Sequence, residues 1–125
     1  MNTKLTPKPF ENVAVVGMHF REKDGIPAKA YVESFVPPVN LLLEREPENA
    51  YDSFAIKVIF NNQHIGYIEA SQAMYIAPWM DDGWQFTCTV VDLEARRNNL
   101  HPICRVEPIN SDLEESETSG ATTAD

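Results

Sequence analysis

Alternation of apolar and polar side chains along two segments constrains the fold of this chain more than any other feature of its sequence. In each segment every second residue is apolar: Phe54, Ile56, Val58 and Phe60 in the first, and Trp84, Phe86, Cys88 and Val90 in the second. A period of two is typical of β-strands with one buried face, so Cys88 is expected to point into a core. Asn61 and Asn62 tolerate left-handed backbone, which predicts a hairpin that returns along 65–68.

Three earlier segments, at about 13–20, 29–36 and 39–46, are also predicted to be strands. Their apolar residues fall on both faces, as in a barrel wall that is covered on its outer side. One main helix is predicted where Ala73, Ile76, Ala77 and Met80 follow helical spacing, with Ser71 as N-cap and Pro78 ending the regular helix near Ala77. Six to seven short strands with one main helix predict a mainly β fold, a small OB-like or SH3-like β-barrel.

The net charge of −9 divides unevenly along the 125 residues. Residues 107–125 hold six acidic side chains and no Lys or Arg, so the other 106 residues carry ten positive and thirteen negative charges. We therefore expect a flexible N-terminal segment at 1–12, a folded domain at 13–107 and a disordered acidic tail at 108–125. The mild acidity of the domain argues against binding that depends on many phosphate contacts.

Several classes of protein lack support in the sequence. There is no apolar stretch of membrane-spanning length and no secretory signal, which predicts a cytoplasmic protein without a membrane partner. Cys88 and Cys104 are expected to be free thiols. The histidines and cysteines show no metal-ligand spacing, and no phosphate-binding glycine loop or catalytic motif occurs. We expect neither a metal nor another cofactor, and no enzymatic activity.

The segment LLLEREPENAYDSFAIKV, residues 41–58, is the densest motif in the chain. A strand runs into Arg45, a compact turn follows, and a second strand begins near Phe54. Pro47 restricts the backbone, while Asn49 and Asp52 have side chains that commonly bond to nearby backbone in turns. On this chemistry alone, the acids and the amide serve only to cap the turn, and Tyr51 and Asp52 lie at the mouth of the barrel.

The order of motifs resembles the HIRAN domain family. The opening strand VAVVGMHF, the turn segment LxREPxNxYDxxAIxV, the hairpin end HIGYI (64–68) and the helix ASQAMYIAPWMDDG (70–83) all occur in the family's order, over residues 13 to about 92. The resemblance implies a β-barrel related to the OB-fold. It also implies capture of the 3′ end of single-stranded DNA, as at the N-terminus of fork-remodelling DNA translocases; the family also includes short standalone bacterial and phage proteins.

Carried over position by position, the resemblance implies a DNA site. Phe20 stands where an aromatic residue, often Tyr, stacks on a terminal base. Tyr51 supplies a second aromatic wall, Asp52 accepts a hydrogen bond from the 3′ hydroxyl, and Asn49 lies near the strand's end. His19 stands where DNA-binding members often have Arg.

Two further positions complete the candidate site. Tyr67 stands where DNA-binding members can have a His that contacts the backbone, and its hydroxyl can still donate to a phosphate. Arg45 is the best additional candidate for a phosphate contact because it adjoins the turn. The resemblance therefore implies a site made of Phe20, Tyr51, Asp52, Asn49, His19, Tyr67 and Arg45.

Two other functions remain open on the sequence. The acidic surface and tail are also consistent with a protein-interaction module that engages a basic partner, such as a DNA-processing or defence enzyme. Alternatively, the turn motif is purely structural and binds no ligand. The sequence does not indicate an oligomeric state.

Overall fold

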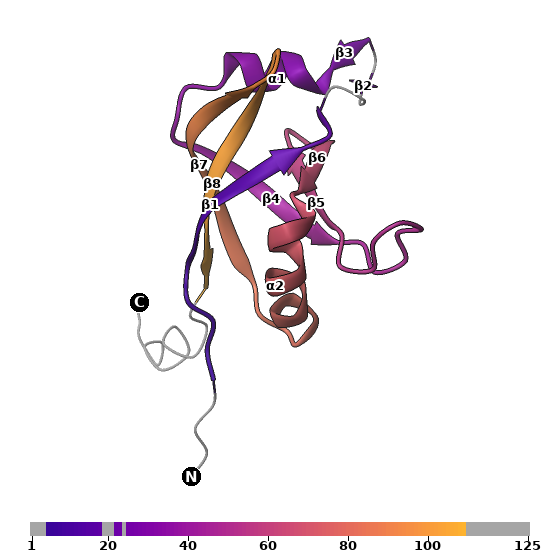
Figure 1. Ribbon diagram of the computed structural model, residues 1–125, viewed down its shortest axis with the longest axis vertical. Coiled ribbons are helices and arrows are strands. Elements are labelled where there is room, and N and C mark those ends of the chain that lie inside the picture. The colour runs from indigo at the N-terminus through magenta and orange to yellow at the C-terminus, as the bar shows by residue number, and fades with distance from the viewer. Residues whose placement is uncertain (1–4, 19–21, 24, 110–125) are drawn as a thin grey trace, which may run out of the picture.

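Six antiparallel strands close into one barrel in the computed structural model, which describes residues 5–18, 22–23 and 25–109 (Figure 1). Their order around the barrel is β1-β6-β5-β4-β7-β8. The strands are β1 (Phe10–Val16), β4 (Val39–Arg45), β5 (Ile56–Phe60), β6 (Gln63–Ile68), β7 (Phe86–Arg96) and β8 (Asn99–Pro108). A separate two-stranded sheet joins β2 (Glu22–Lys23) to β3 (Ile26–Pro27). The predicted small β-barrel is confirmed.

The barrel closes because β1 changes partner along its length. Its first part pairs with β8, whereas Val15 and Val16 pair with Ile68 and Tyr67 of β6. The register shifts after Phe10, and Asn12 has a positive φ of 57° in this irregular stretch. This kinked strand thus joins the two halves of the sheet and brings Val16 beside Tyr67.

The core follows the period-two pattern of the strands. The buried inward residues include Val13, Val15, Ile56, Val58, Cys88, Val90, Cys104 and Val106. Cys88 and Cys104 are buried free thiols, as expected. A side-chain hydrogen bond with Cys104, together with burial, raises the pKa of the Cys88 thiol well above its usual range, so this sulfur is an unreactive part of the core.

Residues 28–34 correct the sequence prediction, because the expected strand at 29–36 is the helix α1 (Ala28–Ser34). Ala28, Val32 and Phe35 are buried and are spaced by four and three residues, which is helical spacing. A short apolar run fits both the period of a strand and the period of a helix, and packing against the barrel decided in favour of the helix. Tyr31 and Phe35 both contact the ring of Phe60, with centroid distances of 5.5 and 4.9 Å.

The second helix, α2 (Ala70–Asp81), is longer than predicted. Glu69 rather than Ser71 occupies the N-cap position, and the helix continues through Pro78 instead of ending near Ala77. Proline removes one backbone donor, but the burial of Ala73, Ile76 and Ala77 holds the helix on the barrel. Gln72 ties its first turn to β1, because its side chain accepts from Ala14 N and donates to Asn12 O. This contact covers the outer side of β1.

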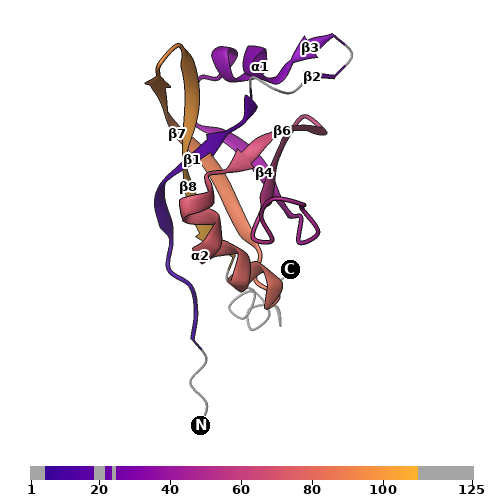
Figure 2. The same cartoon turned by 45° about the vertical axis from the view of Figure 1, so that its right-hand side comes forward.

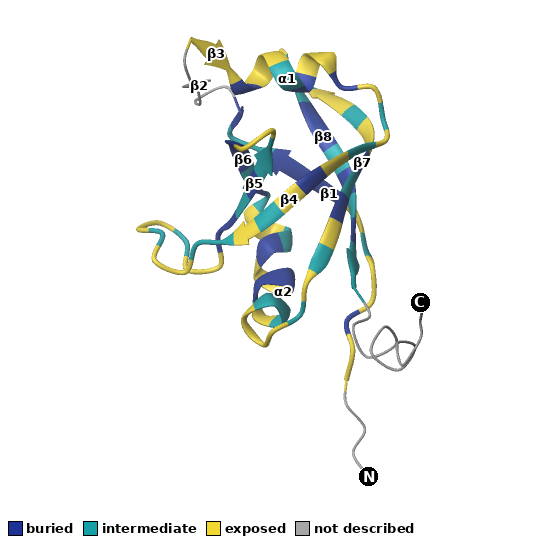
Figure 3. Cartoon of the chain, turned by 180° about the vertical axis from the view of Figure 1, so that it is seen from behind, coloured by how far each residue is buried: buried dark blue, intermediate teal, exposed yellow. Residues whose placement is uncertain are grey.

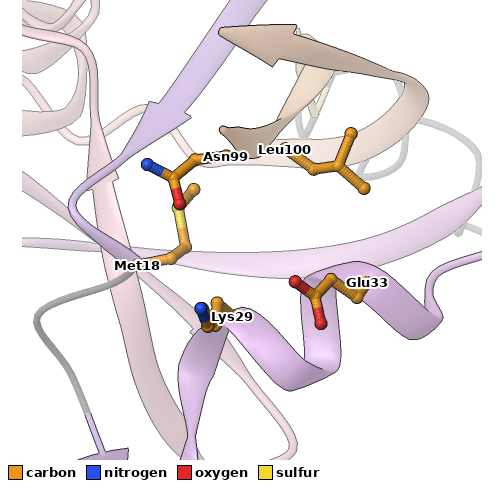
Figure 4. A pocket seen from close by; sticks show the side chains of 5 residues that line it. All are labelled: Met18, Lys29, Glu33, Asn99 and Leu100. Carbon is orange, nitrogen blue, oxygen red and sulfur yellow. The ribbon is translucent and has the colours of Figure 1, made fainter. Parts of the chain in front are cut away.

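The two helices lie at opposite ends of the barrel (Figures 1 and 2). Between α1 and the start of β8 is a cavity of about 10 Å³, lined by Met18, Lys29, Glu33, Asn99 and Leu100 (Figure 4). That volume holds about one water molecule.

Gly66 lies where a side chain would meet the backbone of β1. A Cβ at this position would lie 2.6 Å from the carbonyl oxygen of Val16 and 3.2 Å from the sulfur of Met18. Because backbone cannot move aside as a flexible side chain can, we expect Gly66→Ala to lower the free energy of unfolding by about 1–3 kcal/mol. Urea unfolding monitored by tryptophan fluorescence measures this loss.

Gly25→Ala is the matched control for this prediction. Gly25 has a positive φ of 80°, but a Cβ at this position would meet no heavy atom within 4 Å, so alanine there costs only backbone strain. Equal losses for the two variants would contradict the proposed crowding at Gly66.

Candidate nucleic-acid interface

The loop between β4 and β5, residues 46–55, is held in shape by backbone hydrogen bonds. Glu46 N donates to Ala55 O at 3.0 Å across its base, and Ala55 N donates to Asp52 O at 3.0 Å. The loop projects from the barrel where β4 ends and β5 begins, and most of its surface is exposed (Figures 1 and 3). We call it the β4–β5 loop.

Asn49 organises the tip of the β4–β5 loop. Its Oδ1 accepts from the backbone N–H groups of Tyr51 at 2.8 Å and Asp52 at 3.0 Å. Asp52 Oδ1 in turn accepts from Phe54 N at 2.9 Å. These turn-capping bonds were anticipated from the residue types. They leave Asp52 Oδ2 without a hydrogen bond to any described residue.

Arg45 anchors the loop to α2. Its Nε and Nη2 donate to the carboxylate of Asp81 at 2.8 and 3.1 Å, while Nη1 donates to Ala55 O at 2.7 Å and Nη2 to Ser53 O at 2.9 Å. The Arg45 side chain is only 12% exposed, and its hydrogen bond lowers the pKa of Asp81. Four of the five guanidinium N–H donors are therefore engaged within the protein.

Glu46 joins the loop to β6 through Tyr67. The Tyr67 hydroxyl donates to Glu46 Oε1 at 2.6 Å, and Asn49 Nδ2 donates to the same oxygen at 2.9 Å and to the Tyr67 hydroxyl at 3.4 Å. The hydrogen bonds from Tyr67 and Asn49, assisted by the charges of Lys57 and His64, hold the pKa of Glu46 below its usual value. The His64 ring packs edge-on against Tyr67, at 4.8 Å between centroids.

An open pocket of about 240 Å³ lies between the β4–β5 loop, the end of β6 and the start of α2. Its lining residues are Val16, Asn49, Tyr51, Asp52, Ala55, Tyr67, Ile68 and Ala70. Tyr51 is 97% exposed, so both faces of its ring are accessible to a ligand. The pocket combines an apolar floor, one free aromatic ring and a few polar groups, which is the usual composition of a ligand site.

The structure brings four of the seven predicted site residues into this pocket: Asn49, Tyr51, Asp52 and Tyr67. Arg45 lies beneath the loop, bonded to Asp81 and to loop carbonyls. His19 and Phe20 lie outside the described residues, and their predicted roles stay predictions.

The sequence predicted only turn capping for the acids of this loop, and it missed the contact of Glu46 with Tyr67 of β6. A sequence signal for this contact is the position of Glu46 directly after the strand that ends at Arg45, because an acidic side chain at the end of a strand can reach a neighbouring strand. The apolar floor was also missed, since Val16, Ile68 and Ala70 come from three separate elements.

The fold and the loop define a HIRAN-type barrel, and the chain matches the HIRAN domain over residues 11–107. The chain belongs to the HIRAN domain family, as the sequence motifs predicted. The HIRAN domain is a module known to bind DNA ends and is generally non-catalytic.

Two solved structures share this fold. A protein from Lactobacillus plantarum is 27% identical, with a TM-score of 0.63, over 80% of this chain and 95% of its own. The HIRAN domain of human HLTF is 20% identical, with a TM-score of 0.61, over 90% of this chain and 84% of its own. No curated protein sequence matches the chain. Within the described residues, no helix is long and apolar enough to cross a membrane.

Proposed function

We propose that this chain binds the 3′ end of single-stranded DNA in the pocket beside the β4–β5 loop, as a non-catalytic recognition module. The observation that carries the proposal is the convergence of Asn49, Tyr51, Asp52 and Tyr67 on one open pocket. A volume of about 240 Å³ is below the usual range of about 300–1,000 Å³ for ligand pockets, so the pocket suits one terminal nucleoside better than a long stretch of strand.

Stacking supplies most of the affinity in this proposal. The exposed ring of Tyr51 offers a face to the last base, and a base–aromatic stack contributes about 1–3 kcal/mol whatever the base. Phe20, which lies outside the described residues, is proposed as the other stacking residue.

Asp52 supplies the recognition of the end itself. Its Oδ1 accepts from Phe54 N, which orients the carboxylate, and Oδ2 remains to accept a hydrogen bond from a 3′ hydroxyl. The same negative charge repels a terminal phosphate. Asn49 and Arg45 act in this proposal by holding the loop, rather than by contacting phosphates.

Binding of this kind should depend weakly on salt. Four of the cations in the described residues are paired with carboxylates: Arg45, Lys57, Arg96 and Arg105. With at most about two phosphate contacts, affinity for a single strand should fall less than about tenfold between 50 and 200 mM salt. Fluorescence anisotropy with a labelled oligonucleotide across this range measures the slope. A loss of a thousandfold would indicate binding along the phosphate backbone instead.

The polarity of the end tests the proposal directly. Duplexes with a 3′ single-stranded overhang, a 5′ overhang or blunt ends present the same base pairs but different ends. We expect the 3′ overhang to bind the full chain most tightly. Equal affinity for the 5′ overhang would exclude recognition of the 3′ end, and a general single-strand site would remain.

A further inference from the structure

The helix α2 is apolar on the side that faces away from the barrel as well as on the side that packs against it. The packed side consists of the buried residues Ala73, Ile76 and Ala77. On the other side Met74 is 45% exposed, Tyr75 is 62% exposed, and Pro78 is also exposed. We call these three residues the outer α2 face. A helix that is apolar all round is normally covered on all sides, and no described residue covers this face.

The charge next to the outer α2 face is negative. No Lys or Arg occurs in the sequence between Lys57 and Arg96, and α2 ends in Asp81 and Asp82. Arg45 pairs with Asp81, whereas Asp82 makes no side-chain hydrogen bond or ion pair within the described residues. The helix dipole disfavours a carboxylate at the C-terminal end of a helix. The negative charge of Asp82 is therefore not compensated by the part of the chain that the structure describes.

An open pocket of about 430 Å³ lies at this end of α2, lined by Pro78, Trp79, Asp81 and Asp82. It adjoins the outer α2 face, because Pro78 belongs to both. An indole ring beside carboxylates suits a guanidinium or ammonium group, which can contact the ring and donate charge-assisted hydrogen bonds. The same carboxylates repel a phosphate. The pocket therefore suits a cationic side chain rather than a continuation of a DNA strand.

We propose that the outer α2 face and the pocket beside Asp82 form a docking surface for a partner protein that presents an apolar side chain next to an arginine. The apolar side chain covers Met74 and Tyr75, and the guanidinium enters the pocket. Met and aromatic residues are enriched in such interfaces.

Charge complementarity selects this occupant. Residues 110–125 of the chain itself contain five acidic residues and no Lys or Arg, so Asp82 repels them. The inference does not depend on the proposed function, because the pocket beside the β4–β5 loop includes Ala70, at the opposite end of this 12-residue helix. That length corresponds to about 18 Å, so one chain can hold DNA and a partner at the same time.

The test titrates three blocked tetrapeptides into the isotopically labelled full chain and follows backbone and tryptophan indole signals by NMR. Alternating Leu and Arg supplies both chemistries, alternating Ser and Arg supplies only the charge, and alternating Leu and Glu reverses the charge. We expect the Leu-Arg peptide to shift signals of residues 74–84 and to bind about threefold more tightly than Ser-Arg and about tenfold more tightly than Leu-Glu. Equal affinity for Leu-Arg and Leu-Glu, or no saturable shift in 74–84, overturns the inference.

Tyr75→Ser removes the largest side chain of the outer α2 face. Val36→Ser is the matched control, because Val36 is 80% exposed just after α1, at the opposite end of the barrel. We expect Tyr75→Ser to weaken binding of the Leu-Arg peptide by about tenfold, and Val36→Ser to leave it within about twofold. Equal weakening by the two variants overturns the inference. The peptide comparison needs no variant, so it decides the matter even if circular dichroism shows that Tyr75→Ser does not fold.

A second copy of the chain is the other occupant that the experiment distinguishes. Sedimentation velocity at the concentration of the titrations gives the oligomeric state of the wild type and of Tyr75→Ser. A monomer, or a dimer that persists in Tyr75→Ser, supports a face that is free for a different protein. A dimer that dissociates in Tyr75→Ser assigns the face to self-association and overturns the inference. Each of these failures leaves the proposed DNA site standing.

Discussion

Replacement of Asp52 by asparagine is expected to weaken binding of an oligonucleotide with a 3′ hydroxyl end by about 10- to 100-fold, the usual cost of losing a hydrogen bond to a charged group. Asparagine keeps the Oδ1 atom that accepts from Phe54 N, so the loop should keep its shape. The substitution replaces the Oδ2 carboxylate oxygen, which is proposed to accept a hydrogen bond from the 3′ hydroxyl. Anisotropy titrations of wild type and variant give the two dissociation constants.

Asp82→Asn is the control for this experiment. Asp82 is an exposed acid at the C-terminal end of α2, outside the pocket lining. Asp82→Asn changes the net charge of the chain by the same amount as Asp52→Asn. Because salt screens a distant surface charge, the affinity of the Asp82→Asn variant for the oligonucleotide should remain within about twofold of wild type. Equal weakening by Asp52→Asn and Asp82→Asn would remove Asp52 from the proposed site.

Replacement of Arg45, the last residue of β4, by alanine is expected to produce a large loss of stability. The guanidinium links β4, two loop carbonyls and the Asp81 carboxylate on α2, and its side chain is largely buried. Its removal leaves those acceptors without their donor, which should lower the free energy of unfolding by about 2–3 kcal/mol. The urea midpoint should fall while the slope of the transition stays constant.

Arg45→Lys and Arg97→Ala complete this comparison. An ammonium group cannot form the paired bonds to Asp81 while also reaching both carbonyls, so lysine should recover less than half of the loss. Arg97 is exposed in the turn between β7 and β8, where loss of the side chain should have little effect. Equal urea midpoints for Arg45→Ala and Arg97→Ala would show that the hydrogen bonds of Arg45 contribute nothing measurable to the stability of the fold.

The hydrogen bonds of Arg45 bear on the phosphate contact that the sequence suggested for this residue. Adjacency to the turn motif favoured a phosphate contact, but adjacency in sequence says nothing about which partner a long side chain reaches. In the folded chain Asp81, 36 residues later, takes two of its donors. We therefore expect Arg45 to act on the proposed site through the shape of the β4–β5 loop.

A protein-interaction role remains the competing proposal. It was based on the acidic tail at 108–125 and on the acidic surface. The tail beyond residue 109 lies outside the described residues, whereas the pocket lies within them. The convergence of Asn49, Tyr51, Asp52 and Tyr67 on one pocket supports the DNA-end proposal, and the DNA-end experiments decide between the two functions.

Sequence patterns determined the elements whose physics is local. Alternation along 54–60 and 84–90 predicted strands with one inward face, because successive side chains of a strand point to opposite faces; the strands themselves begin at Ile56 and Phe86. Asn61 and Asn62 predicted the β5–β6 turn, and both have a positive φ. The bonding of Asn49 and Asp52 to the loop backbone was likewise predictable, since both partners lie within three residues. The order of motifs was enough to identify the HIRAN family.

Tertiary structure decided whatever depends on residues far apart in sequence. Packing on the barrel made 28–34 a helix and carried α2 through Pro78, where local preferences predicted a strand and a helix end. The pocket exists because barrel closure places Val16 beside Tyr67 and the loop folds over both. Glu46 meets Tyr67 across 21 positions and Arg45 meets Asp81 across 36, and no local pattern encodes such pairs. The sequence alone thus determined the two alternating strands, the β5–β6 turn and the family, while closure of the barrel decided which side chains share a site.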